Sequence, residues 1–327
     1  MLMTIVGGIL AASLAAAPQT DTTFAVQPGS RLQLRNMGGD IVVRTWDRDA
    51  VRIEADHSAR TVVSVASTGS VVSVRARSSF GPATVVDYRI TVPASMNLDL
   101  AGTYSDIQVE GAQGEVSAQT VQGDVTIHGG RGNVDARSVQ GVVRVDGTRG
   151  QVRANSTSEG VRISNVVGEV SAETVSGDIV LTGVDSRQVE VATVSGDLFY
   201  DGTIQDGGRY AFVTHNGDVT ATVPPRVNAA ISFATMNGDL DSSFDVPSSA
   251  DEHGRRRHTF TLGSGSAQVE FETFSGDIRL RRPGEVRAPE IRSEDEERGS
   301  GRTRAPRPPR VEEPPRPPAA PAPRPRP

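Results

Sequence analysis

Residues 116–169 read VSAQTVQGDVTIHGGRGN, VDARSVQGVVRVDGTRGQ and VRANSTSEGVRISNVVGE when they are written as three rows of 18. Each row begins with Val, has Ala at its third position and has Thr or Ser at its fifth. The tenth and twelfth positions are aliphatic in every row, so two short alternating strands are predicted per row. A fixed period of this length is typical of a chain that coils, with each turn resting on the one before it.

The period extends in both directions along the chain. Apolar residues recur every 18 positions at Ile107, Val125, Val143, Val161 and Ile179, and then at wider steps at Leu198, Val219, Leu240, Phe260 and Ile278. The predicted inward side chains also grow, from Ala136 in an early row to Tyr210 and Phe212 in a later one. Because larger side chains need a wider cross-section, we expect the coil to widen toward its C-terminal end. The predicted fold class is all-β, a single-stranded β-solenoid (β-helix) with about 18–21 residues per turn.

Four segments differ in composition. We expect a signal peptide over residues 1–15, because a short apolar run ends in small side chains with a cleavage position after Ala15. No Arg or Lys precedes that run, so a retained anchor or a misassigned start stays open as an alternative. Residues 24–100 show period-two alternation and form a predicted N-terminal β region, and residues 101–282 form the predicted β-solenoid repeats.

Residues 283–327 hold 13 of the 20 Pro, and we expect them to form a disordered Pro/Arg-rich tail. Within the tail, residues 299–327 carry seven Arg and two Glu, a net charge of +5. The whole chain carries −6, so the remainder carries −6 − 5 = −11. The polar stretch 247–258 is predicted to be a surface loop.

Gly-Asp pairs recur at the corner between the two strands of a row. Asp178, Asp197, Asp218 and Asp239 occupy equivalent positions in four rows, whereas Val142 and Gly160 break the column. Stacked carboxylates about 4.8 Å apart repel each other, so each needs a partner. The favoured interpretation is that each carboxylate accepts backbone N–H groups of its own corner. A ladder of bound cations is the alternative, although the nonapeptide spacing of calcium-binding β-rolls is absent.

Other repeated or titratable residues carry weaker functional readings. A Thr/Ser column (Thr120, Ser138, Ser156, Thr174, Thr193, Thr214, Thr235, Thr273) is expected to stack its hydroxyls at the corner rather than form an ice-binding array. His128 is the one candidate base within the regular coils for an acyltransferase-like helix, but it has no evident partner. Trp46 is the sole Trp, so an aromatic platform for carbohydrate is absent. The chain has no Cys, which excludes disulfides, thiolate metal sites and Cys nucleophiles.

The motif Thr-x-Ser-Gly-Asp-Ile, present at residues 174–179 and 273–278, resembles that of a large family of exported bacterial β-strand-repeat proteins. That family is a domain of unknown function whose members are often labelled adhesins. The likeness covers about residues 30–282, including Gly39-Asp40-Ile41. It implies a β-helical fold and a location in the cell envelope, and it brings no catalytic residues.

From these observations we expect a non-enzymatic, exported β-solenoid that acts as an adhesin or envelope scaffold through its strand faces. The expected location is the periplasm or the cell surface, with an envelope protein or polysaccharide as partner. An alternative is an envelope-stress or regulatory accessory protein whose basic tail contacts an anionic polymer, and a weaker one is a carbohydrate-active β-helix enzyme. We expect no catalytic residue, metal, cofactor, specific nucleic-acid partner or transmembrane segment in the mature chain.

Overall fold

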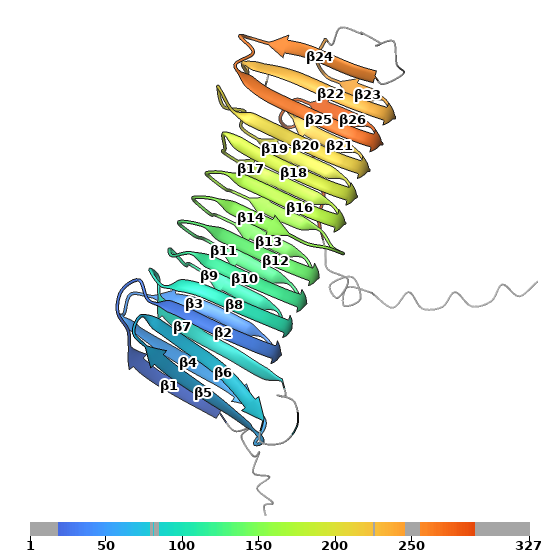
Figure 1. Ribbon diagram of the computed structural model, residues 1–327. Helices are drawn as coiled ribbons and strands as arrows, with labels where there is room; N and C mark the ends of the chain where they lie inside the picture. The colour runs from blue at the N-terminus through green and yellow to red at the C-terminus, as the bar shows by residue number, and fades with distance from the viewer. Residues whose placement is uncertain (1–18, 79–80, 82–84, 225, 246–255, 292–327) are drawn as a thin grey trace, which may run out of the picture. The chain divides into compact units, whose positions relative to one another are not determined.

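The structure is a computed structural model that describes residues 19–78, 81, 85–224, 226–245 and 256–291. Every regular element within these residues is a β-strand, and the strands form two sheets of 13 strands each. Successive coils contribute one strand to each sheet, so the sheets face each other along the stack of coils (Figure 1). The predicted all-β solenoid is therefore confirmed.

Sheet A contains, in spatial order, β1 (Gln19–Ala25), β4 (Ala50–His57), β7 (Val86–Pro93), β3 (Ile41–Trp46), β9 (Ile107–Glu110), β11 (Val125–His128), β13 (Val143–Asp146), β15 (Val161–Ser164), β17 (Ile179–Val184), β19 (Leu198–Gly202), β21 (Val219–Thr222), β26 (Ile278–Arg281) and β23 (Leu240–Ser242). Sheet B contains β24 (Arg256–Leu262), β22 (Ala229–Asn237), β25 (Ala267–Ser275), β20 (Arg209–Asn216), β18 (Gln188–Ser195), β16 (Val170–Ser176), β14 (Val152–Asn155), β12 (Val134–Gln140), β10 (Val116–Gln122), β8 (Asn97–Tyr104), β2 (Arg31–Gly38), β6 (Val71–Ser78) and β5 (Thr61–Thr68).

The 18-residue period of the sequence is the register of the parallel strands. Val125 pairs with Val143 and Val143 with Val161, so chemically equivalent residues lie on top of each other. Their side chains point inward and are fully buried. One coil buries too few aliphatic side chains to offset the entropy of ordering its backbone. Stability therefore comes from stacking, which pairs backbone groups and apolar side chains of neighbouring coils.

Core side chains change in size along the stack, as predicted. Ala136 lies between Ala118 and Ala154 in the register of sheet B, and all three are fully buried. Farther along the same sheet, the rings of Phe212 and Phe271 stack with their centroids 5.1 Å apart. Short coils thus enclose small residues, whereas the longer C-terminal coils enclose aromatic ones.

The last coil does not follow the order of the sequence. The coil of β25 and β26 lies between that of β20 and β21 and that of β22 and β23 (Figure 1). Phe260, expected as the next member of the 18-residue series, instead belongs to β24, which pairs antiparallel with β22 in sheet B. The prediction for Phe260 was wrong because the antiparallel strand that ends the sheet also buries an apolar side chain. Arg256, Arg257 and His258, expected in a loop, are the first residues of that strand.

The strands of residues 24–100 belong to the same two sheets as the later coils. β2 pairs in parallel with β8, and β3 pairs in parallel with β9. Beyond them, sheet A ends with the antiparallel strands β4 and β1, and sheet B ends with β5 antiparallel to β6. The strand β1 was not expected from the sequence. Pro93 ends β7, where it needs no further ladder hydrogen bond.

Residues 283–291 correct the expected start of the tail. They lie against the coils: Ser243 Oγ donates to Glu285 Oε2 at 2.6 Å, and Arg162 Nη1 donates to the Pro289 carbonyl at 3.0 Å. The expected signal peptide over 1–15, residues 247–255 of the expected loop and residues 292–327 of the expected tail lie outside the described residues.

Candidate functional site

The repeated corner between the strands of a coil is built on Gly. At Gly217 the backbone φ is +150°, and an added Cβ would lie 2.0 Å from the Gly196 carbonyl oxygen of the neighbouring coil. That carbonyl oxygen also accepts the Thr214 hydroxyl at 3.1 Å. Gly is therefore required by close approach as well as by conformation. The expected stacking of corner hydroxyls is present, in the form of Thr and Ser hydroxyls that bond to the adjacent coil.

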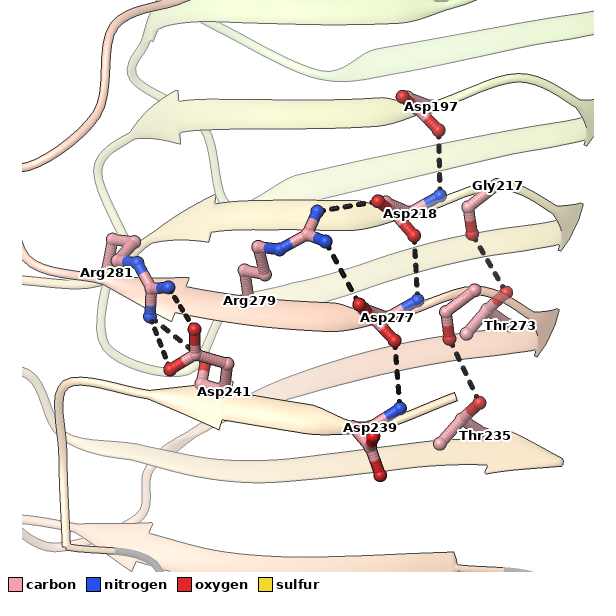
Figure 2. Close-up of polar contacts among 11 residues, drawn as sticks. Asp197, Gly217, Asp218, Thr235, Asp239, Asp241, Thr273, Asp277, Arg279 and Arg281 are labelled. Atoms are coloured by element: carbon pink, nitrogen blue, oxygen red, sulfur yellow. Dashed lines mark hydrogen bonds and ion pairs between the residues drawn. The ribbon is translucent and has the colours of Figure 1, made fainter. Parts of the chain in front are cut away.

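The Asp column forms a second ladder between coils. Asp197 Oδ1 accepts the backbone N–H of Asp218, Asp218 Oδ1 accepts that of Asp277, and Asp277 Oδ1 accepts that of Asp239 (Figure 2). The N–O distances are 2.8, 2.8 and 3.0 Å. The prediction that these carboxylates accept backbone N–H groups is confirmed. The prediction that the N–H groups belong to the same corner was wrong, because they belong to the next coil. The parallel register brings the backbone N–H of the next Asp within hydrogen-bond distance of these carboxylates.

Arg side chains neutralise part of this column. Arg279 donates to Asp218 Oδ2 at 2.6 Å and to Asp277 Oδ2 at 3.0 Å, and it bridges two coils (Figure 2). Burial alone would raise the pKa of Asp218, but the Asp277 N–H and the Arg279 guanidinium together hold it below its usual range. Within the described residues, no group of three His, Asp or Glu side chains is arranged to hold a metal ion. Hydrogen bonds from backbone N–H groups and from Arg279 therefore offset the repulsion between these stacked carboxylates.

Next to the Thr column lies a row of outward side chains that the sequence analysis did not identify. We call it the corner ridge, and its exposed apolar members, in spatial order, are Met37, Val121, Val139, Val175, Val194, Phe274 and Met236. Thr103, Thr157 and His215 occupy the same position in the remaining coils. The second residue of each Thr-Val-x-Gly-Asp motif was the signal for it in the sequence.

The corner ridge is exposed in every coil except that of Thr103, which is half-buried. Its apolar members expose 42–52% of their surface. Neighbouring members contact each other: the rings of His215 and Phe274 stack with centroids 4.8 Å apart, and Thr103 Oγ1 lies 3.9 Å from Met37 Sδ. Because strands in a sheet are about 4.8 Å apart, the ridge presents one side chain at that interval. Single exposed apolar residues are ordinary, but a row of them that recurs in most coils is typical of a contact surface.

A parallel row of uncharged polar residues follows the corner ridge on the side of the Asp ladder. Its members are Tyr104, Gln122, Gln140, Ser158, Ser176, Ser195, Asn216, Ser275 and Asn237. The register pairs Gln122 with Gln140 and Ser176 with Ser195, so the row is as regular as the ridge. Together the two rows form a strip with an apolar side and a hydrogen-bonding side.

The His residues are not brought together. His57 Nε2 lies 2.9 Å from Thr20 Oγ1, and His258 stacks on Phe233 with ring centroids 5.0 Å apart. His128 Nδ1 lies 3.9 Å from Asp146 Oδ2, and both side chains are exposed at their coil corner. The pKa of Asp146 is lowered mainly by the hydroxyl of Ser164 rather than by His128. His253 lies outside the described residues.

A shallow hollow of about 310 Å³ lies on the outer face of sheet B. Its charged lining includes Arg31, Asp99, Glu115, Asp135 and Arg153. Arg31 lies 3.4 Å from Glu115, and Asp135 is paired with an Arg two residues farther along its own strand. Glu115 is therefore a cation partner across coils and Asp135 one within its own strand. No helix in the described part of the chain could cross a membrane.

Three solved structures are similar to this chain. One is described as a candidate adhesin from Parabacteroides distasonis ATCC 8503, with 11% identity, coverage of 81% of this chain and 97% of that chain, and a TM-score of 0.42. Another candidate adhesin, from Bacteroides fragilis NCTC 9343, has 12% identity, 80% and 97% coverage and a TM-score of 0.34. A candidate cell adhesion protein from Clostridium sporogenes ATCC 15579 has 9% identity, 81% and 100% coverage and a TM-score of 0.22.

No curated protein matches the sequence significantly. The family model that matches is described as Toastrack DUF4097, and it covers residues 30–281. The match therefore includes the corner at Gly39 and Asp40 as well as β26, the last strand in chain order.

Proposed function

We propose, for a chain that belongs to the Toastrack DUF4097 family, a non-catalytic, adhesin-like binding role in the cell envelope. The observation that carries this proposal is the corner ridge, with its exposed apolar side chains in register over the stack of coils. The adjacent polar row supplies hydrogen-bond donors and acceptors. The strip suits an extended partner, either an envelope protein segment or a polysaccharide chain.

The polar groups of the corner support a scaffold role. The Thr hydroxyls bond to corner carbonyls of the adjacent coil, and Asp197, Asp218 and Asp277 each accept a backbone N–H through one carboxylate oxygen. These groups hold the coils together, so they are not positioned for proton transfer to a substrate. The side chains at the surface of the corner are the ones left to contact a partner.

The proposal is tested by changing the corner ridge without changing the fold. In the full chain, Val121, Val139, Val175 and Val194 are each replaced by Thr. Thr keeps the β-branched shape that suits a strand, and Thr157 already occupies this column. The matched control replaces Val62 and Val213 by Thr, because both are exposed but lie outside the ridge.

Binding is measured by co-sedimentation of the purified protein with isolated cell envelopes, with polysaccharide-depleted and protease-treated envelopes compared. We expect the ridge variant to bind at least tenfold more weakly than the control, with melting temperatures of both within a few degrees of the wild type. The depleted samples identify whether protein or polysaccharide is the partner. Equal binding of ridge variant and control would remove the ridge as the contact surface.

A further inference from the structure

One patch on the outer face of sheet A departs from the pattern of its neighbours. Val180 and Phe199 point away from the core, in register with Arg162 and Thr220 of adjacent coils. They are nevertheless 0% and 6% exposed, and neither belongs to the core cluster. The same outward position carries Gln108, Thr126 and Arg144 in earlier coils and Val42 in the first one, whereas here two large apolar side chains lie together and are buried.

The break in the Asp column lies beside the same patch. Asp178 and Asp197 are exposed, but Val142 and Gly160, which replace Asp in two coils, are buried. An Asp at either position would place a carboxylate beneath whatever covers the patch, where its desolvation is unfavourable. The two substitutions that interrupt the column therefore fit a covered surface.

Residues 283–291 contact the outer face of sheet A next to this patch. The chain turns after β26, where the Glu285 N–H donates to the Arg282 carbonyl and Gly284 has φ +87°. It then runs back along sheet A, where the Pro289 carbonyl meets Arg162. The Ile291 side chain occupies the space above Gly160, since a Cβ on that Gly would lie 2.7 Å from Ile291 Cγ2.

The path needs no strain. From β26 to β15 the chain passes four strand spacings of sheet A, about 19 Å at about 4.8 Å each. Ten residues join Arg281 to Ile291, and they can span up to about 33–36 Å when extended. Only Ala288 and Ile291 are half-buried among residues 283–291, and the rest are exposed. The segment is thus held by few contacts, which places it among the least stable parts of the fold.

We propose that Val142, Gly160, Val180 and Phe199 form a docking site for an extended peptide, closed in each molecule by its own residues 283–291. We call this segment the latch. Its recognised features are an aliphatic side chain for the Gly160 seat and a carbonyl acceptor two residues earlier for Arg162. When the latch is released, the site takes the latch of a second copy of this chain, as in the exchange of identical elements between protomers.

Closure within one molecule competes with binding from outside. A short connection gives an effective latch concentration in the millimolar range. The wild type should therefore bind a free latch peptide at least tenfold more weakly than a molecule whose own latch is released. At low protein concentration the molecule's own latch therefore outcompetes the latch of a second copy, so the protein is expected to stay monomeric.

The first test uses full-length variants and a labelled synthetic peptide of residues 282–293. Ile291→Asp is designed to release the latch. The double variant Ile291→Asp, Val180→Asp is designed to disrupt the docking site as well. Both changes lie outside the core cluster, and circular dichroism checks the fold. Fluorescence anisotropy should show binding to the single variant, binding at least tenfold weaker to the wild type, and none to the double variant. Equal binding to single and double variants would overturn the site.

The second test is a complementation between copies. Val180→Asp alone leaves the latch intact but disrupts the docking site, whereas Ile291→Asp leaves the docking site intact but disrupts the latch. Analytical ultracentrifugation should show a one-to-one dimer only when the two variants are mixed, above the dissociation constant of the peptide. A monomeric mixture at tenfold that concentration would overturn exchange between copies. Neither test depends on the corner ridge, so each can fail independently of the proposed function.

Discussion

Replacing Gly217 by Ala tests the contact that sets the spacing of the coils. The new Cβ would lie 2.0 Å from the Gly196 carbonyl oxygen, in a backbone conformation with φ +150°. Strain of a non-Gly residue in this region costs about 1–3 kcal/mol. Displacing the neighbouring coil adds about 1–3 kcal/mol of overpacking. The Thr214 hydrogen bond to the same carbonyl is worth about 1 kcal/mol and is weakened as well.

Gly207 offers a matched control. Its φ is +72°, but an added Cβ would meet nothing within 4 Å. Gly207→Ala therefore carries a conformational cost without a contact. The difference between the two variants contains the contact, about 2–4 kcal/mol from the two remaining contributions, together with the extra strain of Ala at φ +150° compared with φ +72°. For a domain of this size, each kcal/mol lowers the melting temperature by about 2–4 °C.

Differential scanning calorimetry on both full-length variants measures this difference. We expect Gly217→Ala to melt about 4–16 °C below Gly207→Ala. Equal losses in the two variants would mean that the coils relax around the methyl group at no cost. In that case the Gly column would be explained by backbone conformation alone.

Four further outcomes are expected. Ala136→Leu should lower the denaturation midpoint more than Phe233→Leu. Ala136 lies between two other Ala residues in a narrow coil, whereas the wider coil around Phe233 tolerates a smaller side chain. Equal or reversed midpoint shifts would contradict the widening of the coils. Chelator or millimolar calcium should leave the thermal melt nearly unchanged, since backbone N–H groups already occupy the Asp ladder; a chelator-induced loss of more than about 10 °C would indicate bound cations. Burial and the nearby carboxylates of Asp106 and Asp87 raise the pKa of Asp40, so its ionisation destabilises the folded state at neutral pH. Asp40→Asn should therefore raise the melting temperature at pH 7, and the gain should vanish below about pH 4, where the wild-type carboxyl is also neutral; a gain that persists in acid would assign it to another cause. Deleting residues 299–327 removes a net charge of +5 and should abolish low-salt retention on an anionic matrix without changing the melt, whereas unchanged retention would leave the tail without an electrostatic role.

The strand register and the inward residues could be predicted because the 18-residue period is a direct record of coil stacking. The place of the last coil could not, since Leu240 and Phe260 satisfy the same apolar pattern whether their strands are parallel or antiparallel. The period also places Asp218 at a corner without stating which N–H it bonds. That choice depends on the distance between coils, which only the three-dimensional register supplies.

The two candidate surfaces left weaker signals. Val121 and Val139 occupy the same position in successive repeats. However, the sequence around an apolar residue next to an inward Thr does not indicate whether its side chain is exposed or buried. The interruption of the Asp column at Val142 and Gly160 is visible in the sequence, yet the residue that lies over Gly160 is Ile291, more than 120 residues later. Contacts that distant follow from the path of the chain rather than from any local preference.

The position of the β25–β26 coil has a consequence for the order in which the chain is made. When synthesis has reached residue 245, β22 and β23 exist but the coil that will separate them from β20 and β21 does not. The β22–β23 coil and the β25–β26 coil carry the same Thr-x-x-Gly-Asp corner. The exposed edges of β20 and β21, on which β25 and β26 finally pack, are therefore open to β22 and β23 first. The finished arrangement is reached only after β25 and β26 emerge and are inserted. Completion at this end is therefore a late, non-sequential event, and a chain interrupted before residue 281 lacks the piece on which its own terminal strands must rest.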